Sequence, residues 1–203
     1  MIKKRGALAF RGIMKKYCLT ICLLCGACGH PSPETVFLND PIQEESTTPD
    51  WSRPPYQFTS LADYTLHARV LSINTHHFGE VAELAPLDFV VGWRNMADPN
   101  VYKKLNIHQS GRWYMYKRDE HSPSISHAQI VYSSSNTHLI PKNKDVLKQL
   151  KNIKTDQVVV LKGRLVEITG PNGFHWRSSL SRTDQGAGGC ELMWVESVEL
   201  VSL

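Results

Sequence analysis

A short apolar run behind a basic start is the feature that most constrains this 203-residue chain. The first 27 residues hold six basic residues and no acidic ones, and residues 17–27 are almost wholly apolar. At about 1.5 Å per residue this run makes about 16 Å of helix, too short for the ~30 Å hydrocarbon core of a membrane. A basic segment, an apolar core and small residues after it are typical of a secretory signal. We therefore expect residues 1–27 to be a signal peptide that contributes nothing to the mature fold.

The end of this leader carries a family resemblance. Leu24-Cys25-Gly26-Ala27-Cys28 resembles the lipobox of bacterial lipoproteins, with Cys25 standing where leucine is usual. The resemblance implies cleavage before Cys28 and lipidation of Cys28 with fatty acyl chains such as palmitate. A plain secretory signal or an uncleaved anchor is the alternative. Met14, followed by two lysines, is a second candidate start.

Removal of the leader changes the cysteine count and the charge. Cys22, Cys25 and Cys28 have metal-site spacing, but they lie in an apolar export segment, so we predict no metal there. Cys190 is then the only unmodified cysteine, which leaves no internal disulfide. Six of the 23 basic residues are lost, leaving 17 against 19 acidic residues. A net charge near −2 argues against a nucleic-acid partner.

Residues 28–55 are predicted to be a flexible tether between the lipid and the domain. The stretch holds many prolines and acidic residues and few apolar ones, a composition that cannot bury enough surface to fold. Trp51 suggests that its end docks onto the domain. Residues 56–203 are then one globular domain, with no repeat and no second domain.

This domain has mainly β patterning. Apolar residues alternate from Tyr64 to Val70 and then slip in phase to Leu71 and Ile73, which predicts a strand with a bulge. Further strands are predicted at 87–93, 112–117, 128–133, 157–168 and 191–201, a short helical turn at 99–105 and a helix at 143–153. We predict a mainly β (α+β) fold: a small curled or partly closed antiparallel sheet with one or two short helices. The element order resembles a five-stranded Greek-key barrel of the OB type, a more open α+β sheet being the alternative.

The segment from His175 to Glu191 is the strongest candidate for a site, because it is rich in hydrogen-bonding side chains and glycine. In a binding loop, arginines would hold an anion and a tryptophan would stack on a ring. In the alternative, the segment is a mobile hairpin whose Arg and Asp side chains pair with one another. The candidate ligand-binding residues are Trp176, Arg177, Ser178, Arg182 and Asp184.

Catalysis is the weaker hypothesis. Cys190 is a candidate nucleophile with His138 as its base, but a lone cysteine at a strand start is more often a small buried residue. A serine within residues 178–181 is a further candidate, without a nucleophile-elbow motif around it. Residues 133–138 either present ligand contacts or form a loop that caps the following helix. We predict no cofactor, and the nine histidines show no metal-ligand spacing.

Three segments of the domain, 87–93, 134–138 and 176–184, resemble a family of bacterial envelope proteins for which no activity is established. The resemblance covers residues 56–203, implies an envelope setting and transfers no site residues. We therefore expect a membrane-anchored envelope lipoprotein that is a non-enzymatic binding or assembly module, with a protein or glycan partner. The alternative is an envelope hydrolase. Gly29, in place of the aspartate of inner-membrane lipoproteins, resembles the outer-membrane sorting pattern, which predicts residence there, facing the periplasm.

Overall fold

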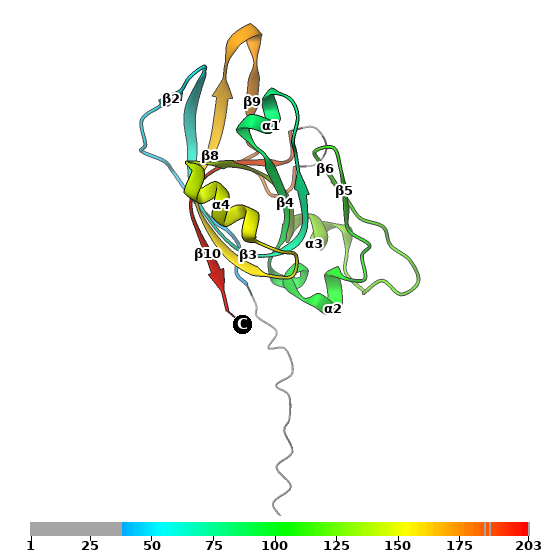
Figure 1. The fold of residues 1–203 in the computed structure, drawn as a ribbon. Helices are drawn as coiled ribbons and strands as arrows, with labels where there is room; N and C mark the ends of the chain where they lie inside the picture. The colour runs from blue at the N-terminus through cyan, green and yellow to red at the C-terminus, as the bar shows by residue number, and fades with distance from the viewer. Residues whose placement is uncertain (1–37, 185, 187, 203) are drawn as a thin grey trace, which may run out of the picture. The chain divides into compact units, whose positions relative to one another are not determined.

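The computed structural model describes residues 38–184, 186 and 188–202 (Figure 1). The chain divides into two units, residues 1–33 and 34–203, and the described residues all belong to the second. The predicted signal peptide and Cys28 lie outside the described residues. Within the described part of the chain, no helix has the length and apolar character needed to cross a membrane.

Five strands form a closed ring. Each pairs with the next in the order given, and the last pairs back with the first: β3 (Tyr56–Thr75), β4 (Leu87–Gly92), β7 (Ser134–Pro141), β10 (Glu191–Val201) and β8 (Val158–Thr169). The β7–β10 pair is parallel and the other four are antiparallel. The predicted mainly β, curled fold is confirmed, and the ring follows the strand order of an OB-type barrel. The sheet is mixed rather than wholly antiparallel.

Local sequence explains where the barrel strands bend. The register of β3 against β4 shifts between Val70 and Ser72, which confirms the bulge predicted from the slip in apolar phase. At Gly163 in β8, a Cβ atom would lie 1.9 Å from the carbonyl oxygen of Trp194, so only glycine allows β10 to approach this closely. These two positions let long strands curl into a barrel.

Helix α4 (Lys144–Asn152) covers the barrel end at which β7 finishes. Asn143 caps it by accepting a hydrogen bond from the backbone N–H of Val146 (2.9 Å), and Val146 and Leu150 are buried in the barrel core. The helix predicted over 143–153 is thus confirmed. In chain order α4 follows β7 and precedes β8, and in Figure 1 it lies across the barrel.

Short elements fill the connections. They are α1 (Glu80–Leu84), η1 (Arg94–Ala97), α2 (Pro99–Tyr102), β5 (His108–Ser110), β6 (Trp113–Met115), α3 (His127–Tyr132), η2 (Pro171–Gly173) and β9 (His175–Arg177). The strand predicted over 128–133 is wrong, because Ser126 and Gln129 form a capping box that starts α3 there. The described residues therefore hold more short helices than the one or two predicted.

The structure corrects the predicted tether from Leu38 onward. Strands β1 (Ile42–Glu44) and β2 (Trp51–Arg53) pair with β3, and Leu38 is buried in the barrel core. The indole of Trp51 stacks on Phe58 with ring centroids 5.4 Å apart, as the predicted docking requires. Here β1 and β2 satisfy backbone hydrogen-bonding groups along the edge of β3, and such pairing does not require apolar side chains. Composition alone therefore did not predict that these residues are ordered.

Candidate functional site

A layer of polar side chains occupies the barrel end opposite α4, where β7 and β10 begin. Side chains alternate along a strand, so Glu191 shares the inward face of β10 with Met193 of the barrel core. Ser135 shares the inward face of β7 with Leu139 in the same way. The Ser135 hydroxyl donates a hydrogen bond to the Glu191 carboxylate, and both residues are buried. Burial raises the pKa of Glu191 to about 7.

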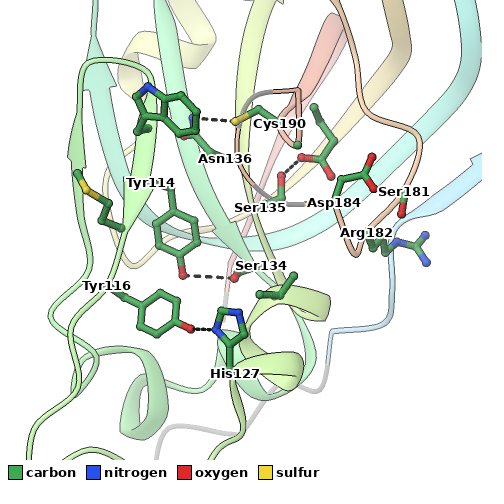
Figure 2. Close-up of a pocket in the computed structure, with 16 residues that line it drawn as sticks. Tyr114, Tyr116, His127, Ser134, Ser135, Asn136, Ser181, Arg182, Asp184 and Cys190 are labelled. Carbon is green, nitrogen blue, oxygen red and sulfur yellow. Dashed lines mark hydrogen bonds between the residues drawn. The ribbon is translucent and has the colours of Figure 1, made fainter.

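A pocket of about 340 Å³ opens onto this layer. Figure 2 shows its two walls: Tyr114, Tyr116 and His127 on one side, and Arg182 and Asp184 on the other. Tyr114 lies in β6 and Tyr116 directly follows it. The second wall belongs to the connection from the end of β9 to the first residue of β10, which we call the 178–191 loop. The Tyr116 hydroxyl is hydrogen-bonded to Nδ1 of His127, and the Tyr114 hydroxyl lies 3.3 Å from the hydroxyl of Ser134.

A second pocket of about 570 Å³ adjoins the first. The two pockets have Trp113, Gly186 and Cys190 as common lining residues, so they are neighbouring parts of one hollow, which we call the groove. The groove runs over β7, between the β5–β6 hairpin and the 178–191 loop. Trp113 stands at its rim with half of its surface exposed.

A buried carboxylate holds the hairpin wall in place. Asp88 of β4 is inaccessible to solvent, and its Oδ1 lies 2.7 Å from Nη1 of Arg112, in the turn of the hairpin. His76 Nε2 lies 2.8 Å from Oδ2 and His138 Nδ1 lies 2.9 Å from Oδ1 of the same carboxylate. Arg112 also donates to the carbonyl oxygens of Val81 in α1 and of Ala85, the residue that follows α1. The buried carboxylate under the groove is therefore compensated by Arg112, which also ties the hairpin to α1.

Trp176 and Arg177, both predicted as ligand-binding residues, line the second pocket. The indole of Trp176 packs against two groups. The guanidinium of Arg112 lies 5.3 Å from the centre of its ring, and the imidazole of His138 lies 5.1 Å away between ring centroids. Arg177 forms an ion pair with Glu167 of the neighbouring strand. This arginine is thus already paired, although with Glu167 rather than with an aspartate of its own loop.

Arg182 and Asp184, two further candidate ligand-binding residues, line the first pocket, whereas the candidate Ser178 does not line the groove. Arg182 donates through Nη2 to the carbonyl oxygen of Pro41, and Figure 2 shows its guanidinium pointing away from the tyrosines. The Ser178 hydroxyl is buried, where it accepts a hydrogen bond from the backbone N–H of Leu192 (2.9 Å) and donates to the Ser179 carbonyl (2.8 Å). Ser178 fastens the loop to β10.

Cys190 and His138, the candidate catalytic pair, both line the second pocket. Burial raises the pKa of the Cys190 thiol to about 11, so the thiol is protonated at neutral pH. Its sulfur accepts a hydrogen bond from Asn136 Nδ2 at 3.8 Å, whereas Nδ1 of His138 faces Asp88. Within residues 38–184, 186 and 188–202, no group of three or more His, Cys, Asp or Glu residues is arranged to hold a metal ion.

Sequence reasoning placed Glu191 and Ser135 within candidate segments, 175–191 and 133–138, but singled out neither residue, and it missed the tyrosines. The sequence does carry a signal for Glu191. It lies two and four residues before Met193 and Val195, on the same apolar face of a strand, so its carboxyl is expected to point inward. Ser135 belongs to a polar segment predicted as a loop or cap, but that segment is the buried central strand β7. Nothing in the sequence signals that Tyr114 approaches the 178–191 loop.

Comparison with known proteins returns no relative: no protein-family model, curated protein sequence or solved structure matches the chain.

Proposed function

We propose that the chain is a membrane-anchored lipoprotein of the bacterial cell envelope whose barrel is a non-enzymatic binding module. The observation that carries the binding part is the groove, in which aromatic rings and hydrogen-bonding groups from the hairpin, β7 and the 178–191 loop face one hollow. By fold-level analogy, OB-type barrels bind extended ligands on the face of their second and third strands, beside the loop that joins the fourth and fifth. Here those strands are β4 and β7, and that loop holds residues 178–191.

The chemistry of the groove favours binding over hydrolysis. A cysteine nucleophile reacts as the thiolate, and the raised pKa of Cys190 keeps its thiol neutral. Ser178 is buried and hydrogen-bonded to the backbone, so its hydroxyl has no path to a substrate in this conformation. The Ser179 hydroxyl is hydrogen-bonded to Asp184 and to the Ser181 carbonyl, an arrangement that shapes a turn.

The envelope setting rests on the leader and on the lipobox-like segment before Cys28. Gly29 supports residence at the outer membrane in an organism that has one. The partner is a protein or a glycan of the envelope, since the slightly acidic mature chain offers no charge basis for nucleic-acid binding.

Photo-crosslinking of the full-length chain in intact cells tests this function. We expect p-benzoylphenylalanine at position 113, on the groove rim, to give a discrete crosslinked product. The same group at position 148, on the exposed side of α4, is the matched control and should give none. A protein partner gives one band of fixed mass, whereas a glycan gives a ladder that digestion of the glycan collapses. Equal products from both positions, or none from position 113, would contradict a binding groove.

A further inference from the structure

The first pocket has a feature that an extended-ligand groove does not require: a buried carboxylate without a counter-ion. Among the described residues, neither Glu191 nor Asp184 forms an ion pair within 4 Å. The Glu191 carboxylate accepts a hydrogen bond from Ser135, a neutral donor. Burying a charged carboxylate is costly unless a cation compensates it.

The titratable groups that face Glu191 do not supply that cation. They are Tyr64, Arg182, Asp184 and Cys190. Arg182 is the cation among them, but it donates to the carbonyl oxygen of Pro41, and its attraction leaves the pKa of Glu191 raised rather than lowered. Asp184 adds a second negative charge and Tyr64 is neutral. The pocket therefore keeps an excess of negative charge whenever Glu191 is ionised.

Aromatic rings complete the pocket on the side away from the carboxylates. Tyr114 and Tyr116 lie with ring centroids 6.1 Å apart at 41°, and Tyr116 and His127 with centroids 6.1 Å apart at 33°. The face of a tyrosine ring attracts a cation such as a lysine ammonium group, and grouped aromatic rings also bind quaternary ammonium ligands. Two carboxylates opposite such rings complement a compact positive charge from both sides.

We propose that the first pocket binds a primary ammonium group, with the Glu191 carboxylate as its counter-ion and Tyr114 and Tyr116 as its aromatic wall. This inference rests on the proposed binding function and names the chemical group that the groove selects. The ammonium comes from a lysine side chain of a partner protein or from a free alkylamine. At about 340 Å³ the pocket has room for a lysine side chain.

Calorimetric titration of the full-length protein in detergent tests the proposal. The probe is Nα-acetyl-lysine methylamide, and its neutral counterpart is the Nε-acetylated form. We expect the charged probe to bind at least tenfold more tightly than the neutral one. Pentylamine separates the two sources: equal binding of pentylamine shows that a free amine suffices, and binding of the lysine probe alone shows that the peptide groups are needed. Equal affinity for the charged and neutral probes would overturn the proposal.

Substitutions locate the site. Glu191→Gln should weaken binding of the charged probe at least tenfold, whereas the matched acid-to-amide change Glu167→Gln, outside the first pocket, should leave it unchanged. If Glu191→Gln prevents folding, the pH dependence of the wild-type protein gives a second test. Affinity should fall by up to tenfold per pH unit below about pH 7, because the protonated carboxyl must release its proton on binding.

His127 is a further titratable residue that lines the pocket. In a His127→Asn variant the decrease in affinity at low pH should therefore persist. Unchanged affinity in Glu191→Gln, or an affinity that is flat between pH 5.5 and 8, would refute the role of Glu191.

The binding function and the ammonium site can be disproved independently of each other. Crosslinking from position 113 without ammonium binding removes only this inference, while loss of crosslinking removes the proposed function and leaves the titration result standing.

Discussion

Nη1 of Arg112 lies 2.7 Å from Oδ1 of Asp88, and this contact joins the turn of the β5–β6 hairpin to the second strand of the barrel. Asp88 has no solvent-exposed surface, so its carboxylate is contacted by protein groups rather than by bulk water. Because Trp176 packs against Arg112, the same contact links the hairpin to β9, which lines the second pocket.

Arg112→Ala is therefore expected to destabilise the domain. Removal of one partner from a buried ion pair costs about 3 kcal/mol or more, since it leaves a buried charge partly compensated. The free energy of unfolding measured in urea reports this loss. Arg177→Ala is the matched control: Arg177 is about half exposed in its pair with Glu167, so its loss should cost less than about 1 kcal/mol. Equal losses in the two variants would mean that Asp88 does not depend on Arg112.

Cys190 should react slowly with iodoacetamide. A pKa raised to about 11 leaves little thiolate at pH 8, so we expect alkylation at least about tenfold slower than in the urea-unfolded chain. Mass spectrometry of the peptide that contains Cys190 measures the rate. The rate should keep rising with pH up to pH 10. Rapid alkylation that levels off near pH 7 would instead indicate an activated thiol and favour the hydrolase alternative.

Glu191 should make the stability of the domain depend on pH. Its pKa is raised to about 7 in the folded state from 4.5, so the folded protein holds this proton more tightly than the unfolded chain. The resulting stabilisation is fully present below pH 4.5 and is lost as the pH rises to about 7, by about 3 kcal/mol. Urea unfolding at several pH values, with Glu191→Gln as the reference, measures the difference. A constant difference between the two proteins would contradict the raised pKa.

The domain should begin at Leu38 rather than at Tyr56. A chain that starts at residue 38 should unfold cooperatively, whereas one that starts at residue 56 lacks β1 and β2 and should be unfolded or aggregated. Leu38→Ala tests the same point more gently, with an expected loss of about 2–4 kcal/mol for a buried leucine. Circular dichroism during thermal unfolding compares the three. Equal stability of the two truncated chains would restore a domain that begins at residue 56.

Lipidation has a direct test. Cells that express the full chain and are fed a radiolabelled fatty acid should label the wild-type protein and not a Cys28→Ser variant. Cys190→Ser is the matched control and should keep the label. Labelling of Cys28→Ser at the wild-type level would exclude Cys28 as the lipidated residue.

Much of the barrel could be predicted from the sequence, because its buried strands contain alternating or β-branched apolar residues. The strands at 87–93, 157–168 and 191–201 and the helix at 143–153 are each within two residues of their positions in the structure. Even the bulge at Leu71 follows from the phase of the apolar residues. In these elements, local pattern and final packing agree.

Strand β7 could not be predicted in this way. Its first residues are serine, asparagine and threonine, which usually favour turns, yet the whole strand is buried. Its polar side chains find partners far away in the sequence: Ser135 bonds Glu191, and Asn136 bonds the Arg112 carbonyl oxygen (2.9 Å). Composition singled out residues 175–191, but the opposite wall of the groove depends on these long-range contacts.

Because residues 38–55 are part of the domain, they also limit how far the domain can lie from a lipid on Cys28. If Cys28 carries a lipid, residues 29–37 alone separate it from the buried Leu38, and nine residues span at most about 30 Å when fully extended. That length is comparable to the diameter of a small domain. A tether of this size lets the domain turn but keeps it beside the bilayer surface. Any ligand would then be captured from the layer next to the lipid headgroups rather than from across the periplasm.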